Sequence, residues 1–207
     1  AGKTTLMNIL FGYYACDEGQ IFIKGEKVNL SAPKDAITRG VGMIHQHFAL
    51  VPSQTVLENI IVGTASRRGI FLDPASARQA LVELQERFGL QIDPDARVWT
   101  LSVGEQQKVE ILKALYRDVD ILIMDEPTAA LGPQETQMVA ELIKQLKAQG
   151  IGIFLIEHDV HSVMNLCDRA SVMKNGQLVG TVNVDEVTDE DILSMIILGK
   201  KPGQATA

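Results

Sequence analysis

The sequence has few cysteines, few aromatic residues and no long hydrophobic run. Its 207 residues include two cysteines, Cys16 and Cys167, and 5% aromatic residues. Two cysteines far apart, without metal-type spacing, exclude a disulfide framework and favour a reducing compartment. The longest apolar stretches, 121–124 and 151–156, are far shorter than the roughly 20 residues of a membrane-spanning helix. The sequence shows no signal-peptide pattern, and we expect any membrane role to depend on a partner protein.

Basic residues are also scarce. Lys and Arg number 19 against 26 Asp and Glu, and the net charge is −7. The phosphate backbone of a nucleic acid attracts a basic surface, so this balance argues against a nucleic-acid partner. The remaining composition, 46% apolar, suffices for one domain with a full core and a smaller lobe.

The most informative stretch is residues 121–128, Ile-Leu-Ile-Met-Asp-Glu-Pro-Thr. Four consecutive apolar residues predict a strand buried on both faces of a parallel sheet. Asp125 and Glu126 then follow at its carboxyl end, where open α/β sheets bind their ligands. Two adjacent buried acids need a positive partner, typically a metal ion. The alternative is a strand that ends in a solvated acidic turn.

The chain begins with Ala1-Gly2-Lys3-Thr4-Thr5 and continues into an apolar helical stretch. This pattern is typical of the second half of a phosphate-binding loop that opens a helix. The amides of the helix start suit phosphate oxygens, Lys3 would reach the terminal phosphates, and the Thr4 hydroxyl would hold Mg²⁺. We therefore expect this sequence to be incomplete at its amino terminus, without the upstream glycine and the strand that feeds the loop.

Two further apolar strands deliver polar residues in the same way. The strand 41–44 precedes Gln46, and the strand 151–156 precedes His158. Gln46 could be a plain loop residue or a neutral amide that reaches a metal ion or a water molecule. His45 and His47 flank Gln46, but a third ligand is not evident, so a metal site there is not expected.

The stretch from residue 52 to 101 is predicted to be helical. Thr55 and Glu58 form a candidate capping box, and Asp73 and Pro74 begin a second helix. Ser102 and Glu105 form another capping box at the start of a helix that runs through 115. Its Gly104 costs about 1 kcal/mol relative to Ala, which is tolerable where something must approach the backbone closely.

The other expected elements are two hairpins and four helices. They are a hairpin over 21–28 turning at Gly25, a helix capped by Ser31, a helix from Pro133 ended by Gly150, a helix capped by Asp159, a hairpin turning at 175–176, and a helix from Thr188 to Gly199 followed by a loose tail.

Five separated pieces together resemble the ATP-binding cassette (ABC) ATPases over nearly the whole chain. They stand in the family's order: the end of Walker A (Gly2-Lys3-Thr4), the Q-loop (Gln46), the signature (Leu101–Glu105), Walker B (Ile121–Glu126) and the switch histidine (His158). The resemblance implies an α/β P-loop NTPase fold, with a mostly parallel core sheet flanked by helices, a helical subdomain and a small antiparallel β part. In that reading, 1–51 and 119–182 form the RecA-like core, 52–118 the helical signature subdomain, and 183–207 the carboxyl-terminal helix and tail.

The resemblance also implies a division of roles among these residues. ATP phosphates would be bound by Lys3 and the first-turn amides, and Mg²⁺ by Thr4, Gln46 and Asp125. Glu126 would be the general base, with Gln46 and His158 completing the catalytic set. The signature would bind the ATP of a second cassette. The nucleotide-binding positions are then Ala1, Gly2, Lys3, Thr4, Thr5, Ser102, Val103, Gly104 and Glu105.

The sequence departs from the usual family pattern at Val103, Glu105 and Gly132, where the family usually has glycine, glutamine and aspartate. The stretches 45–52 and 101–116 look like those of bacterial importers of simple sugars and nucleosides, many of which carry two cassettes in one polypeptide. The implied partners are membrane-spanning permease subunits, bound through the Q-loop and the helical subdomain, a second cassette and, indirectly, an extracytoplasmic solute-binding protein. The implied location is the cytoplasmic face of a bacterial inner membrane.

Two other functions stay open at this point. One is a cassette that binds ATP without hydrolysing it, which the departures at Val103 and Gly132 would suit. The other is a soluble ABC ATPase that acts on DNA or the ribosome, which the acidic charge disfavours. Small-molecule kinases with a P-loop lack the combination of signature and Walker B.

Overall fold

A computed structural model describes residues 2–46, 48–64 and 74–201. The chain divides into two compact units. The first comprises Ala1–Asp35 and Leu155–Ala207, and the second comprises Ala36–Phe154. The predicted division into core, signature subdomain and tail stays a prediction.

The second unit contains the predicted central strand. The three-stranded sheet has the order β3-β4-β5, with β3 Val41–Ile44, β4 Ile121–Asp125 and β5 Gly152–Ile156. β3 and β4 are parallel, and β4 is buried almost throughout, as its apolar run predicts. The helix α6, Pro133–Ala148, connects β4 to β5 and buries Val139, Leu142, Ile143 and Leu146.

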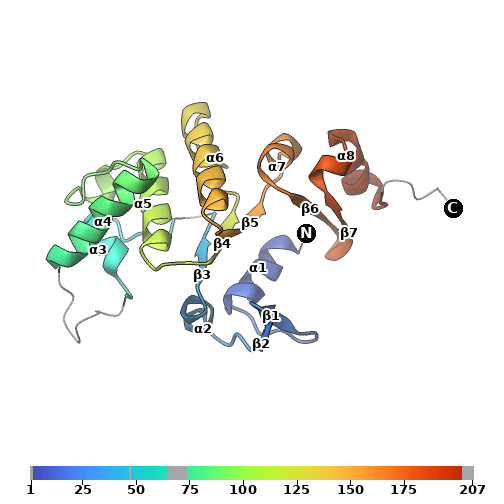
Figure 1. The fold of residues 1–207 in the computed structure, drawn as a ribbon, viewed down its shortest axis with the longest axis horizontal. Coiled ribbons are helices and arrows are strands. Elements are labelled where there is room, and N and C mark those ends of the chain that lie inside the picture. Colours follow the sequence, from blue (N-terminus) through green and yellow to red (C-terminus); the bar gives the residue numbers. More distant parts are fainter. Residues whose placement is uncertain (1, 47, 65–73, 202–207) are drawn as a thin grey trace. The chain divides into compact units, whose positions relative to one another are not determined.

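Three helices form the helical part of the second unit (Figure 1). They are α3 Val56–Ile61, α4 Pro74–Phe88 and α5 Val103–Leu115, with the short 3₁₀ helix η1 Val98–Thr100 before α5. α3 packs against both α4 and α5, and α5 also contacts β3. α5 therefore joins the helical part to the sheet edge that carries Gln46. The residue predicted to cap α4, Asp73, lies outside the described residues.

The first unit combines two hairpins with helices. Its elements are α1 Lys3–Phe11, β1 Ile21–Ile23, β2 Glu26–Val28, α7 Val160–Leu166, β6 Arg169–Lys174, β7 Gln177–Asn183, η2 Val184–Glu186 and α8 Asp189–Leu198, and α2 Pro33–Thr38 begins at its boundary. Both hairpins turn where predicted, at Lys24-Gly25 and Asn175-Gly176, whose residues all have positive φ. Within the described residues, a core cluster forms between β6, η2 and α8, from Ala170, Val172, Val184, Ile192 and Met195.

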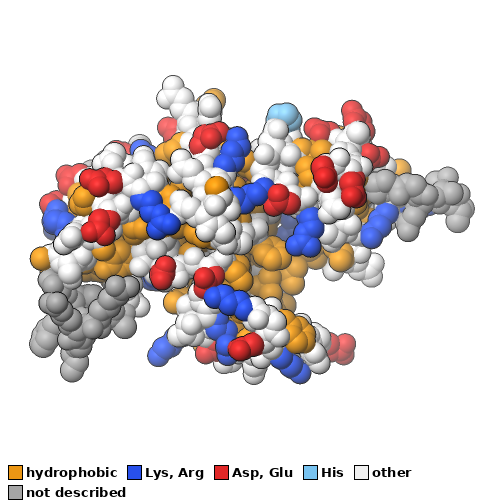
Figure 2. Space-filling view, viewed as in Figure 1, with side chains coloured by type: hydrophobic (Ala, Val, Ile, Leu, Met, Phe, Trp, Pro, Cys, Tyr) orange, Lys and Arg blue, Asp and Glu red, His pale blue; other side chains and the backbone are white. Residues whose placement is uncertain are grey.

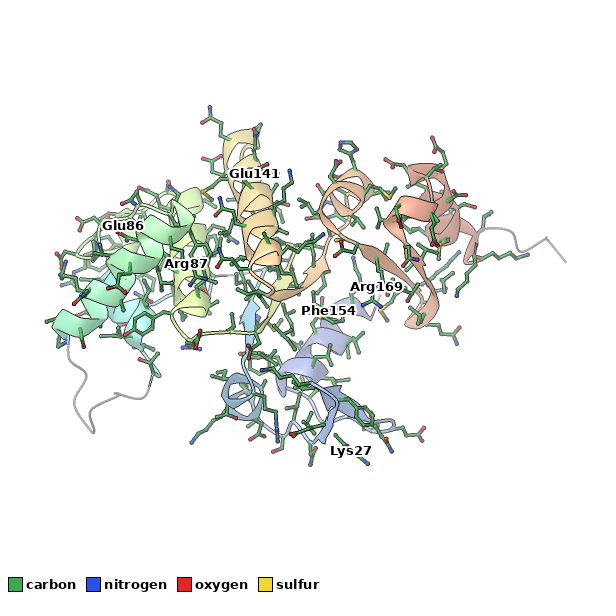
Figure 3. The ribbon with its side chains drawn as sticks, viewed as in Figure 1. Lys27, Glu86, Arg87, Glu141, Phe154 and Arg169 are labelled. Carbon is green, nitrogen blue, oxygen red and sulfur yellow. The ribbon has the colours of Figure 1, made fainter. Side chains whose placement is uncertain are left out.

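One local prediction differs from the structure, and one predicted strand is more exposed than its neighbours. Ser31 does not cap α2 through its own oxygen; its hydroxyl donates to the Asp35 carboxylate, which also accepts the backbone N–H groups of Ser31 and Ala32. β5 is all apolar after Gly152, yet Phe154 (Figure 3) is 51% exposed. In the described part of the chain β5 is an edge strand, so an apolar sequence alone does not bury it.

Candidate nucleotide and catalytic site

The strand register brings Gln46 and Glu126 together. The last register pair of the parallel strands β3 and β4 is Ile44 with Met124. Gln46 and Glu126 each follow two residues after their member of this pair. The Gln46 side-chain N–H donates to the Glu126 carboxylate, with Nε2 3.0 Å from Oε2. The parallel strands thus place the neutral Gln46 amide next to Glu126, the carboxylate that the sequence resemblance assigns as general base.

Asp125 and Glu126 occupy different environments at the end of β4. Asp125 is 5% exposed and is the last residue of the strand. Glu126 has a φ of 47°, in the left-handed region that non-glycine residues rarely adopt. Such backbone strain persists only where surrounding structure enforces it and is common at functional sites. The buried carboxylate of Asp125 and the amide of Gln46 are oxygen-bearing groups that suit a hard cation such as Mg²⁺.

The loop after Gln46 is held by buried polar side chains from α3 and α5. Asn59 accepts the Val51 N–H and donates to the Val51 carbonyl oxygen, at 2.7 and 3.1 Å. On α5, Glu110 accepts the Ala49 N–H at 2.6 Å, and Lys113 donates to the Ala49 carbonyl oxygen at 2.7 Å. Glu110 and Asn59 are 4% and 2% exposed. The position of the Gln46 loop is therefore tied to the helix that starts at the signature.

The signature forms the predicted capping box at the start of α5. The Ser102 N–H donates to the Glu105 carboxylate at 2.8 Å, and the Glu105 N–H donates back to the Ser102 hydroxyl at 3.3 Å. The backbone N–H of Ser102, and after it the Ser102 hydroxyl, donate to the Glu105 carboxylate and hold its pKa below its usual range. Ser102 and Val103 are exposed at this helix end.

Gly104 is buried, whereas Ser102 and Val103 before it are exposed. A Cβ built on Gly104 would lie 2.6 Å from Cγ of Glu135, in the first turn of α6. The Glu135 side chain therefore approaches this backbone closely, and the approach of a phosphate from a second cassette stays a prediction. Sequence reasoning missed Glu135, because an acid in the first turn of a helix has an ordinary explanation as a dipole partner.

The first unit brings the proposed Lys3 to the segment that carries His158. Gly2, at φ 92°, precedes α1, and Lys3 is the first residue of the helix. The Lys3 ammonium donates to the carbonyl oxygen of Glu157, with Nζ and O 3.4 Å apart. Thr4 and Thr5 are exposed in the first turn, with their backbone groups at the helix start. Ala1 lies outside the described residues.

Glu157 is the second residue that sequence reasoning missed. Its side chain is 3% exposed, while that of His158 is 67% exposed. The Glu157 carboxylate accepts the His158 N–H at 3.0 Å, and Oε1 lies 3.2 Å from Nδ1 of the imidazole. A carboxylate at Nδ1 favours the tautomer that leaves Nε2 as an acceptor. The apolar strand that ends just before Glu157 could have indicated this residue. An acid that is buried at the end of such a strand needs a polar neighbour, and His158 is the next residue.

Within the described residues, no three His, Cys, Asp or Glu side chains cluster as a metal site. Likewise, none of the described helices is long and apolar enough to cross a membrane.

Comparison with known proteins decides the family. The model of the ABC transporter family matches residues 1–129 of this chain. The chain belongs to the ABC transporter family. It is an ATP-binding domain of that family, with the P-loop cassette fold that the five motifs predict.

The similar curated proteins carry names of import ATP-binding proteins. The chain is 44% identical to "Nucleoside import ATP-binding protein NupA" of Lactococcus lactis subsp. cremoris (strain MG1363) over 95% of its length and 39% of the relative's. It is 43% identical to "Putative ribose/galactose/methyl galactoside import ATP-binding protein 2" of Burkholderia lata, over 95% and 38% of the two chains. This ABC chain therefore spans about two fifths of the length of the curated relatives it matches.

The cassette fold of this ABC domain recurs among solved structures. One is "Dimeric structure of a post-hydrolysis state of the ATP-binding cassette MJ0796 bound to ADP and Pi", with a TM-score of 0.76 and 25% identity. The match covers 88% of this chain and 80% of that one. The predictions of fold class and family are thereby confirmed.

Proposed function

We propose that this ABC domain hydrolyses ATP to ADP and phosphate and so powers the import of a simple sugar or a nucleoside. The observation that carries the proposal is the pairing of the Gln46 amide with the Glu126 carboxylate, beside the buried Asp125. A carboxylate held at the carboxyl end of a central strand suits a base that takes a proton from water. The names of the relatives support import, and they support nucleosides and sugars as the solute class.

Phosphoryl transfer needs precise positioning and charge stabilisation more than covalent chemistry. The amides of Gly2 to Thr5 and the Lys3 ammonium would hold the phosphates at the start of α1. Glu126 would accept the proton of the attacking water, and His158, oriented by Glu157, would contact the γ-phosphate through its imidazole. Gln46 would hold the Glu126 carboxylate in place.

Thr4, Gln46 and Asp125 are the residues that would hold Mg²⁺, because their side chains supply the oxygen ligands that this cation prefers. When bound, Mg²⁺ supplies positive charge beside the phosphates. Asp125 supports this assignment, since it places a carboxylate, the hard oxygen ligand that Mg²⁺ prefers, at the carboxyl end of β4.

The signature would bind the ATP of a second cassette, either a separate copy or the other half of a tandem polypeptide. Ser102 and Val103 are accessible for that contact, and α5 presents its positive end there. The dimeric form of the similar cassette supports this arrangement.

The proposed membrane partners are permease subunits on the cytoplasmic face of a bacterial inner membrane, and a solute-binding protein would act with them from outside. The surface proposed for the permease lies beside the Q-loop, where the Trp99 N–H donates to the Pro52 carbonyl oxygen at 3.1 Å. Trp99 is 63% exposed and Val51 is 41% exposed. Exposed aromatic and apolar side chains of this kind are enriched at protein interfaces.

On the face that Figure 2 shows, Lys and Arg side chains are interspersed with Asp and Glu. A mixed surface of this kind supports a protein partner over a nucleic acid.

Molecular mass measured by light scattering tests the proposal. In the natural protein with Glu126→Gln, MgATP should be bound but not hydrolysed, and the two cassettes should associate only when it is present. The parent should hydrolyse ATP at least about a hundredfold faster than the variant, the usual scale of a general base. Equal hydrolysis in both would overturn the role of Glu126, and absence of hydrolysis in the parent would favour a cassette that only binds ATP.

A further inference from the structure

The Glu135 side chain lies between two glycines from separate segments. A Cβ on Gly104 would lie 2.6 Å from Cγ of Glu135, and a Cβ on Gly132 would lie 2.8 Å from its Oε2. Neither glycine has a positive φ, so backbone conformation does not require glycine at either position. The close approach of Glu135 leaves no space for a Cβ at either position unless the Glu135 side chain moves away.

The charge of Glu135 lies at the amino-terminal ends of two helices. It is in the first turn of α6, whose N-cap is Gly132. Its Oε1 is also 3.4 Å from the Cβ position of Gly104, in the first turn of α5. The unpaired N–H groups of a helix start favour a negative charge nearby. A carboxylate therefore already occupies the place where an incoming anion would meet α5.

We propose that Glu135 is a positioning residue that keeps the first turn of α5 closed and that has to withdraw from Gly104 before an ATP phosphate reaches this turn. The inference rests on the proposed function, since that phosphate belongs to the nucleotide of the second cassette. Gly132 leaves space for the Glu135 carboxylate, because a Cβ at this position would lie 2.8 Å from Oε2. Gly132, which follows Leu131, is thus linked to the signature residue Gly104 through the Glu135 carboxylate.

The packing half of the proposal is tested without nucleotide. In the natural protein, Gly104→Ala lowers the melting temperature, because the new methyl group meets Glu135. Adding Glu135→Ala to that variant restores part of the loss, although Glu135→Ala alone has little effect. If the double variant melts no higher than Gly104→Ala alone, Glu135 is not what excludes a side chain from position 104, and the proposal is overturned.

The charge half is tested by hydrogen exchange of the amides of 103–105 during a MgATP titration, in the Glu126→Gln background. Glu135→Gln keeps the shape of the side chain and removes its charge. The MgATP concentration that gives half-maximal protection should fall by about two- to fivefold, the range that one charge at a helix end supplies. A merely structural role would leave this concentration unchanged.

Glu141→Gln is the matched control on the same helix (Figure 3), since its side chain is 57% exposed and faces Lys144. It should leave the titration unchanged. Equal half-maximal concentrations for the parent and Glu135→Gln would overturn the inference alone. Absence of MgATP-dependent protection in the parent would overturn the proposed binding of the signature to the ATP of a second cassette, and this inference with it.

Discussion

Gln46 and Glu126 are 80 residues apart in the chain, and a hydrogen bond joins their side chains, with Nε2 3.0 Å from Oε2. The bond follows from the parallel register of β3 and β4, which ends at Ile44 and Met124. Its effect is to fix the direction of a carboxylate whose own backbone is strained, with φ at 47°. The Q-loop residue thus holds the proposed base directly.

Replacing Gln46 with Ala should lower kcat by about one to two orders of magnitude, since a hydrogen bond to a charged group contributes roughly 1.5–3 kcal/mol. Steady-state phosphate release at saturating MgATP measures it. The control is Gln79→Ala, which removes an amide that donates to Glu83 at 3.2 Å on the exposed face of α4. A Gln46→Ala variant with the parent kcat would show that this hydrogen bond does not assist hydrolysis.

Ser102 and Thr55 cap two helices with the same reciprocal hydrogen bonds, at the starts of α5 and α3. Each Ala substitution should lower the free energy of unfolding by about 1 kcal/mol, the usual value for a lost N-cap. Only Ser102→Ala should also weaken the MgATP-dependent association of cassettes, because only Ser102 is in the proposed phosphate contact. Urea unfolding and light scattering separate the two effects, and equal association in both variants would contradict the role of Ser102.

Burial lowers the pKa of His45 below its ordinary value of 6.5, and this effect outweighs the opposing attraction of Glu110 and Asp125. Between the lowered folded pKa and 6.5 the unfolded chain binds more protons than the folded chain, so stability rises with pH through this window. Acidification below pH 6.5 should therefore destabilise the protein, with the loss complete once the pH is below the folded pKa.

His45→Gln should make the melting temperature less dependent on pH between about 5 and 7, the range in which histidine normally titrates. His161→Gln, at a side chain that is 77% exposed, should leave the pH dependence as in the parent. The carboxyl groups with a lowered pKa, among them Glu58 and Glu105, start from 4.5 or lower and lose their stabilising effect only at lower pH. A parental pH profile in His45→Gln would contradict the assignment.

Glu110→Ala should destabilise the fold by about 2 kcal/mol, because a buried carboxylate that accepts the Ala49 N–H is removed and that donor loses its partner. Glu110→Gln keeps an acceptor oxygen and should recover most of this loss. The control Glu83→Ala removes an exposed acid of α4 and should have little effect. Urea unfolding measures the stability of all three variants. Equal stability of Glu110→Ala and the parent would contradict the proposal that Glu110 holds the Gln46 loop through Ala49.

Local structure was determined by the sequence itself. The capping boxes at Thr55 and Ser102 and the turns at Gly25 and Gly176 form as expected, since their hydrogen bonds and dihedral preferences involve residues close in the chain. The order of the five motifs likewise sufficed for the family, because phosphate chemistry restricts which residue types can serve at each position.

Contacts between distant segments were decided only by the tertiary structure. Sequence pattern did not reveal that Glu135 covers Gly104 or that Glu157 is buried beside His158. It also did not predict the exposure of Phe154, because burial depends on which strands and helices flank a segment and not on its own apolar residues. The sequence identified the residue types that could serve in catalysis. Packing between distant segments determined which carboxylate each of these residues contacts.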